Sequence, residues 1–160
     1  MNNNGFQVRI IEELTPGFLR EARNLYLENR WIDENYNPDF PRNAFAGSFA
    51  VAGAFAPDGS LAGVARAVSD GVSDAYIQDV MTASSCRRQG VGKLVTCALV
   101  EELKKRKIEW IGVVGVPGTE KFYASCGLKC APGHTLWLGG DAFAFSCKKS
   151  HSSSEDTVAK

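Results

Sequence analysis

The sequence predicts a single-domain α/β (α+β) fold with a mixed, mostly antiparallel sheet flanked by helices. Short apolar segments separated by turn signals alternate with two longer segments whose apolar residues recur at helical spacing. A basic, glycine-containing loop joins one predicted strand to the longer helix. The 160 residues, 44% of them hydrophobic, are enough to bury one core.

The chain begins with a predicted strand and helix. Residues 6–11 are expected to form the strand. Thr15 and Pro16 suit the N-cap and first position of a helix that runs to about Asn29. Two prolines break any long element in the stretch that follows, which leaves room for one short helix around 41–47.

Three strands follow, joined by tight turns. Residues 48–56 and 61–69 flank Pro57-Asp58-Gly59-Ser60, a sequence typical of a turn. A second turn at Asp70-Gly71 leads into a strand over 72–82. These three strands are therefore expected to be antiparallel neighbours.

The remaining elements follow the glycine loop. A long helix is predicted over 91–107, followed by a strand over 108–114 that is nearly continuous in apolar residues and therefore expected to be buried. Gly127 suits the C′ position of a short helix over 120–126. Two closing strands are predicted at 136–138 and 142–147.

The loop between the strand over 72–82 and the long helix has the properties of a phosphate site. Gly90 and Gly92 permit close approach of a ligand and positive φ. The first turn of the helix offers unpaired N–H groups and a positive dipole end, to which Arg87, Arg88 and Lys93 add charge. The loop is therefore predicted to be a phosphate-binding site, most plausibly for a pyrophosphate. The alternative is a plain strand-to-helix turn.

Spacing excludes two common phosphate motifs. A nucleotide P-loop needs Ser or Thr after Gly-Lys, but Leu94 follows Lys93, and Arg87 stands where that motif has its first glycine. A dinucleotide fingerprint needs a third glycine where Val95 stands. Another phosphate ligand, such as a nucleotide bound in a different way, stays an open alternative.

Composition limits which classes of ligand and which cellular compartment are expected. Equal numbers of basic and acidic residues, 18 each, give no global field toward nucleic acid or an anionic membrane. The five cysteines form no Cys-x-x-Cys pair, so neither a metal site nor a disulfide framework is expected. The first residues lack the pattern of a signal peptide, and a cytoplasmic protein is the expectation.

Three segments together resemble the GCN5-related N-acetyltransferase (GNAT) superfamily. Arg87-x-x-Gly90-x-Gly92 is similar to its acyl-coenzyme A signature, and it lies between 76–82 and 121–127, the latter similar to the family's Phe-Tyr-x-x-x-Gly stretch. The part from 76 to 127 looks most like glucosamine-phosphate N-acetyltransferases and other small stand-alone members. The resemblance implies one N-acetyltransferase domain over 1–148. The tail over 149–160 is rich in Ser, Lys and acidic residues and is expected to be disordered.

The resemblance implies where acetyl-CoA would bind. In the family the strand before the loop splays from its neighbour and pairs with the pantetheine arm, and the loop backbone wraps the pyrophosphate. Thr119 replaces an asparagine that often contacts the cofactor. The cofactor-binding residues implied are Val80, Met81, Thr82, Arg87, Arg88, Gln89, Gly90, Val91, Gly92, Lys93, Thr119 and Phe122.

Catalytic roles also follow from the resemblance. Tyr123 matches the tyrosine proposed to protonate the departing thiolate, a role that suits a phenol; the alternative is a core aromatic. Asp79 is the best-placed carboxylate to take the amine proton, and its alternative role is structural. The fallback bases are Glu34, Asp33 and Asp74. His134 is expected to be a solvated loop residue, and Cys126 has no placed base for covalent catalysis.

The acceptor is expected to contact the stretch between the first two helices. Trp31, Tyr36 and Phe40 are the candidates, and their alternative is to cover an edge of the core. The sequence thus predicts transfer from acetyl-CoA to a primary amine of a small molecule in a ternary complex. The open alternative is a non-catalytic acyl-CoA-binding regulator. Residues 142–147 could also form a homodimer contact.

Overall fold

The computed structural model of the chain describes residues 5–131. Contacts group Met1–Lys129 into one compact unit, and of residues 130–160 only Cys130 and Ala131 are described. His134, the strands predicted at 136–138 and 142–147, and the predicted tail therefore lie outside the described residues. The elements in chain order are β1 (Gln7–Ile10), α1 (Pro16–Glu28), α2 (Phe40–Ala46), β2 (Ala50–Phe55), β3 (Leu61–Ser69), β4 (Asp74–Thr82), the 3₁₀ turn η1 (Ser84–Cys86), α3 (Val91–Lys105), β5 (Trp110–Val113) and α4 (Glu120–Ser125).

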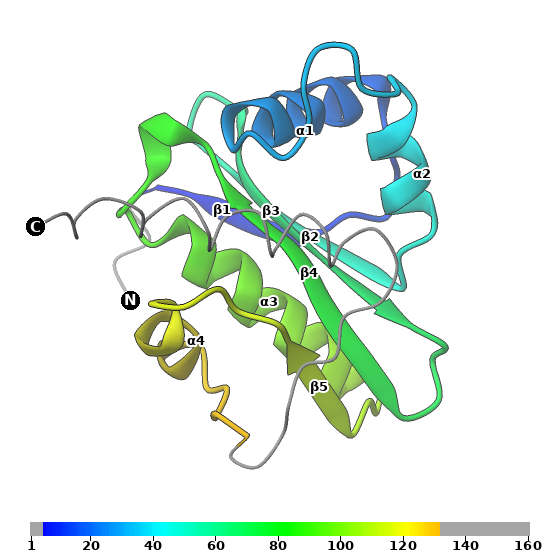
Figure 1. Ribbon diagram of the computed structural model, residues 1–160, viewed down its shortest axis with the longest axis vertical. Coiled ribbons are helices and arrows are strands. Elements are labelled where there is room, and N and C mark those ends of the chain that lie inside the picture. Colours follow the sequence, from blue (N-terminus) through cyan, green and yellow to red (C-terminus); the bar gives the residue numbers. More distant parts are fainter. Residues whose placement is uncertain (1–4, 132–160) are drawn as a thin grey trace, which may run out of the picture. The chain divides into compact units, whose positions relative to one another are not determined.

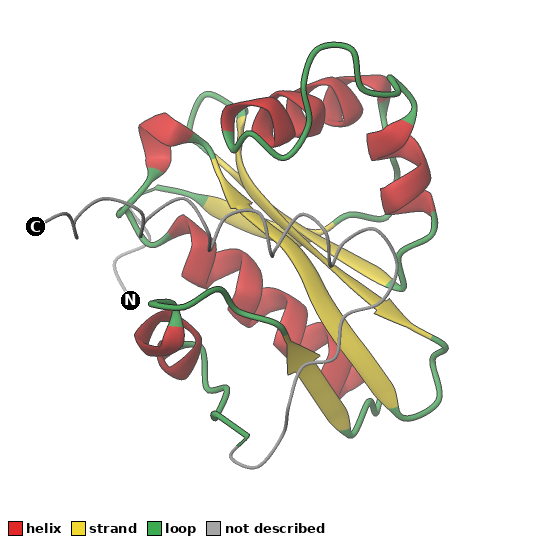
Figure 2. Ribbon diagram, viewed as in Figure 1, coloured by secondary structure: helices red, strands yellow, loops and turns green. Residues whose placement is uncertain are grey.

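The five strands form one sheet in the order β1-β2-β3-β4-β5. The first three pairings are antiparallel and β4–β5 is parallel. Helices α1 and α2 lie on one face of the sheet and α3 lies on the other (Figures 1 and 2). The predicted mixed, mostly antiparallel sheet flanked by helices is confirmed.

Each face of the sheet buries its own core. The core on the α3 side joins alanines of the central strands to the apolar stripe of α3, including Val91, Val95 and Leu99. The core on the other side joins α1 and α2 to the sheet through residues such as Tyr26 and Met81. Two apolar faces on one sheet explain why its central strands are almost wholly buried.

One irregularity in β4 changes which face its side chains occupy. Arg66 of β3 pairs with Gln78 and Val64 pairs with Met81, so two residues of β4 stand where β3 has one. This is a β-bulge, and Asp79 within it has φ 52°. Before the bulge Ile77 points into the α3-side core, whereas after it Met81 points into the α1-side core.

The pairing of β4 with β5 ends early. Only Asp74 to Ile77 pair with β5, while β4 itself continues to Thr82 (Figure 1). Strands β4 and β5 therefore separate toward the glycine loop, which confirms the predicted splay. Along its last residues β4 has an edge that β5 does not cover.

Local signals at helix ends behave as expected. The Thr15 hydroxyl accepts a hydrogen bond from the Phe18 N–H at 3.2 Å and caps α1, with Pro16 in the first turn. Gly127 follows α4 with φ 85°, as its predicted C′ position requires. The long helix stops at Lys105, two residues before the predicted end, because Lys107 adopts φ 65°.

The prediction that the strand over 108–114 is buried was wrong in part. Ile108 is buried, but Trp110 is 47% exposed and Val114 is 64% exposed. Side chains alternate across a strand, and only Ile111 and Val113 pack against the α3-side core. An apolar run therefore did not mean burial on both faces here.

Gly63 lets the start of α3 approach β3. A methyl group there would lie 2.6 Å from Val91 Cγ1 and 2.8 Å from the Met81 carbonyl oxygen. We expect Gly63→Ala to lower the free energy of unfolding by about 1–3 kcal/mol, because the backbone on one side cannot yield. Urea denaturation measures this. Gly17→Ala in α1 is the matched control, since its methyl would meet no atom closer than 3.9 Å; equal stability of the two variants would contradict the close contact.

Candidate functional site

The loop after β4 encloses a cavity of about 260 Å³ at the start of α3. Arg88 and Gly90 take left-handed conformations, with φ 62° and 87°, which turn the chain between η1 and the helix. The structure brings together eight of the predicted cofactor residues as the cavity lining: Thr82, Arg87, Arg88, Gly90, Val91, Gly92, Lys93 and Phe122.

The charges of this cavity favour an anion. Its lining includes three cationic side chains and no acidic one. Gly90, the N-cap of the 15-residue helix α3, provides no side-chain cap, so the first-turn N–H groups are not used by that residue. The helix dipole adds a positive end at the same place. The site can therefore hold a diphosphate through backbone N–H groups and flanking cations.

The two glycines of the loop differ in backbone conformation. Gly90 has a positive φ, whereas Gly92 lies inside α3 with helical geometry and still lines the cavity. A methyl group on Gly92 would lie 3.4 Å from Phe122 Cε2 and 3.4 Å from Thr82 Oγ1. The start of α3 therefore lies close to both α4 and the end of β4.

Four predicted cofactor residues lie outside the cavity lining. Met81 is buried in the α1-side core, and Val80 packs toward α3. Both belong to the part of β4 beyond its pairing with β5, where the prediction concerned their backbone. The Gln89 side chain donates to the Ser85 carbonyl at 2.9 Å, and the Thr119 hydroxyl donates to the Val116 carbonyl at 2.6 Å. Each of these two side chains therefore forms a hydrogen bond to the backbone of its own loop.

Tyr123 lies on α4 next to the cavity. Its ring packs edge-on against Phe122, with centroids 4.9 Å apart, and it is half-buried. Burial, and then the neighbouring Cys126 thiol, raise the pKa of the Tyr123 phenol. The phenol is therefore protonated at neutral pH, the state that a proton donor needs.

Asp79 is held by partners from two elements. Its Oδ2 accepts a hydrogen bond from the Tyr26 hydroxyl at 2.6 Å and is ion-paired with Arg66 Nε. Arg66 also donates to Gln78 Oε1 at 2.7 Å. These bonds show the structural role that sequence left as an alternative. Its role as a base stays a prediction.

Tyr26 is a site residue that sequence reasoning missed. It lies in the apolar stripe of α1 and is only 1% exposed. Burial, then the hydrogen bond and charge of Asp79, raise the pKa of its phenol above the ordinary 10.0. A buried tyrosine needs a hydrogen-bond partner for its hydroxyl, and this requirement is the feature of the sequence that could have indicated a polar contact at Tyr26.

The predicted acceptor residues gather around Tyr26. Ring centroids of Trp31 and Phe40 lie 6.1 and 5.1 Å from that of Tyr26, and Tyr36 lies 5.2 Å from Phe40. Phe40 packs against the α1-side core, as the core-edge alternative has it. Trp31 and Tyr36 are 51% and 46% exposed, which leaves their rings accessible to a ligand.

The loop that carries these rings is tied to α1 by one arginine. Arg23 donates to the carbonyl oxygens of Glu34, Tyr36 and Asn37 at 3.2–3.3 Å. The three fallback bases are exposed. Asp33 and Glu34 lie in this loop, and Asp74 lies at the far end of β4.

The sequence profile of the acetyltransferase (GNAT) family matches residues 12–128. The chain belongs to this family. The predicted resemblance is confirmed, and with it, at the level of the family, the prediction of an acetyltransferase. The match includes the glycine loop, α3 and α4.

A sequence relative supports the same assignment. GCN5-related N-acetyltransferase 3, chloroplastic, of Arabidopsis thaliana is 36% identical over 70 residues, which is 44% of this chain. The match spans 30% of that protein's length, so less than a third of the relative is represented here.

Solved structures share the GNAT fold at low identity. Glucosamine-6-phosphate N-acetyltransferase of Arabidopsis thaliana has a TM-score of 0.62 at 15% identity, covering 83% of this chain and 97% of that one. A transcriptional regulator from Bacillus halodurans reaches 0.66 at 22%, covering 84% and 100%. An acetyltransferase from Trypanosoma brucei reaches 0.61 at 17%, covering 84% and 99%. At these identities the likeness concerns the fold.

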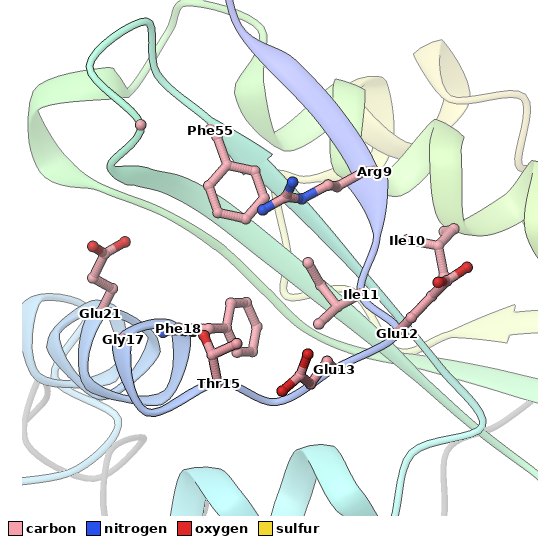
Figure 3. A pocket seen from close by; sticks show the side chains of 11 residues that line it. Arg9, Ile10, Ile11, Glu12, Glu13, Thr15, Gly17, Phe18, Glu21 and Phe55 are labelled. Carbon is pink, nitrogen blue, oxygen red and sulfur yellow. Dashed lines mark hydrogen bonds between the residues drawn. The ribbon is translucent and has the colours of Figure 1, made fainter.

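A larger cavity of about 600 Å³ lies elsewhere, between the end of β1, the start of α1 and the β2–β3 hairpin (Figure 3). No predicted site residue lines it. Arg9, its one lining cation, stacks on the Phe55 ring at 4.3 Å, and the lining also contains Glu12, Glu13 and Glu21. Three carboxylates disfavour a diphosphate, whereas the lining of the smaller cavity at α3 has cations and no carboxylate.

Among residues 5–131, which the structure describes, no group of three or more His, Cys, Asp or Glu side chains has the arrangement of a metal site. None of the helices there is long and apolar enough to cross a bilayer. Cys86, Cys97, Cys126 and Cys130 are free thiols.

The Tyr26–Asp79 bond should be visible in stability at high pH. The folded pKa of Tyr26 is raised above its unfolded value, so its contribution is complete below about pH 10 and is lost as the pH rises toward the folded pKa. Above pH 10 the wild type should lose about 1.4 kcal/mol per pH unit more than Tyr26→Phe. Urea denaturation from pH 8 to 11 measures the difference. Parallel curves for the two proteins would contradict the shift.

Proposed function

We propose that this chain transfers an acetyl group from acetyl-CoA to a primary amine of a small molecule. The observation that carries the proposal is the cation-lined cavity at the start of α3, directly beyond the uncovered edge of β4. Family membership makes acetyl-CoA the natural ligand of such a site. The acceptor class and the direct mechanism are inferences from the surrounding residues.

The cofactor loop and β4 would bind acetyl-CoA in two parts. Backbone N–H groups from Gly90 to Lys93, with the side chains of Arg87 and Arg88, would hold the diphosphate. The edge of β4 from Val80 to Thr82 would pair with the pantetheine arm as an added strand. Its N–H groups would then polarise the thioester carbonyl as charge develops on that oxygen.

The transfer needs one base and one acid. The acceptor amine loses a proton to Asp79, directly or through a water, and its nitrogen attacks the thioester carbon. The new bond joins nitrogen to the acetyl carbon, and the carbon–sulfur bond breaks. Tyr123 gives its proton to the departing thiolate, and holding both substrates in one complex supplies further rate.

The acceptor would enter beside the rings of Trp31, Tyr36 and Phe40. Trp31 and Phe40 pack against Tyr26, which contacts the proposed base, and Tyr36 packs against Phe40. Exposed aromatic faces can bind apolar groups and also attract organic cations. A small amine fits this surface.

The proposal also includes location of the protein in the cytoplasm.

Thermal unfolding tests the cofactor. Acetyl-CoA at about 100 times its Kd should raise the midpoint by about 5–10 °C, whereas ATP and NAD should not. Arg88→Asn is the matched variant, because asparagine tolerates the left-handed conformation but carries no charge; its shift should be smaller. A shift with ATP alone would assign the cavity to another ligand.

Substitution of the proposed acid tests catalysis. Tyr123→Phe should lower kcat by about 100-fold with the Kd for acetyl-CoA within about twofold of wild type, because the lost hydroxyl acts in the transition state. Thiol release with a panel of amines gives kcat. Undiminished kcat would exclude Tyr123 as the acid. Binding without turnover for any amine would instead support the regulatory alternative.

A further inference from the structure

The last turn of α1 makes two contacts with the cofactor loop. The Ser84 N–H, at the start of η1, donates to Glu28 Oε2 at 2.9 Å. The Arg87 side chain donates to Asn29 Oδ1 at 3.1 Å. Neither Glu28, the last residue of α1, nor its C-cap Asn29 lines the cavity, yet both contact the segment that forms it.

Asn29 is itself held in one orientation. Its side-chain amide donates to the Leu25 carbonyl at 2.8 Å, within α1, and lies 3.5 Å from the Thr82 carbonyl at the end of β4. With its nitrogen engaged in this way, its oxygen faces Arg87. A long arginine side chain has much conformational freedom, and a fixed acceptor reduces it.

Glu28 presents an electrostatic conflict. Its exposed carboxylate accepts a hydrogen bond from a loop that would bind a diphosphate, and a negative charge near that site opposes binding of an anion. The hydrogen bond to Ser84 has the opposite effect, because it fixes the loop in one conformation before the ligand arrives. The two effects can be separated, since glutamine keeps an acceptor oxygen but lacks the charge.

We propose that Glu28 and Asn29 are positioning residues of the acetyl-CoA site, acting through Ser84 and Arg87. Glu28 fixes the start of η1, and Asn29 directs the Arg87 guanidinium toward the cavity that it lines. The inference rests on the proposed function, since it assigns the cavity to acetyl-CoA. It adds the last residue of α1 and its C-cap, neither of which lines the cavity itself.

The first test compares substitutions of two carboxylates on the same helix. Glu21 also accepts a backbone N–H, from Leu61 at 2.7 Å, but away from the cofactor loop. Calorimetric titration of the full chain with acetyl-CoA should show the Kd raised about three- to tenfold by Glu28→Ala and unchanged by Glu21→Ala. Glu28→Gln should bind at least as tightly as wild type. Unchanged or tighter binding by Glu28→Ala would overturn the role of Glu28.

The second test asks whether Asn29 acts through Arg87. Asn29→Ala should also raise the Kd about three- to tenfold in the wild-type background. In the Arg87→Gln background the same substitution should have little effect, because the side chain that it positions is gone. An equal loss in both backgrounds would overturn the proposed route. Thermal midpoints without ligand separate lost stability from lost affinity.

The wild-type titration distinguishes the two levels of inference. If wild type binds acetyl-CoA and the α1 variants bind equally well, the positioning role falls and the proposed function stands. If wild type does not bind acetyl-CoA, the proposed function falls and the positioning role falls with it.

Discussion

The single extra residue in β4 determines the geometry on both sides of the sheet. Asp79 adopts φ 52° there, a conformation that costs a non-glycine residue about 1 kcal/mol. The Arg66 ion pair and the Tyr26 hydrogen bond, both on Oδ2, compensate for it. Without the bulge Met81 would share the face of Ile77, and the α1-side core would lose one of its largest buried side chains.

The same bulge sets the position of the glycine loop. Pairing with β3 resumes beyond it, at Val64 with Met81 and Gly63 with Thr82, whereas pairing with β5 has already ended. The end of β4 is therefore fixed on one edge and uncovered on the other. Gly63 also admits Val91 closely, and a methyl group on Gly92 would lie 3.4 Å from Thr82 Oγ1, so the start of α3 lies against the end of β4.

Local signals in the sequence predicted most of the fold, and long-range contacts account for what they missed. The cap at Thr15, the turn at 57–60 and the glycine loop depend on residues near one another in the chain. The Tyr26–Asp79 bond joins residues 53 positions apart, and the bulge exists only in the register with β3. The exposure of Trp110 likewise depends on which helices cover which face.

The structural role of Asp79 limits how it can act as a base. A proton on its carboxylate would remove the negative charge that pairs with Arg66, whose side chain is only 15% exposed, and an unpaired buried cation is costly. Both donors bind Oδ2, however, so a proton on Oδ1 would leave the two hydrogen bonds in place. Only the charge of the pair would be lost. In the proposed transfer, Oδ1 is therefore the oxygen of Asp79 that could take the amine proton without breaking either hydrogen bond.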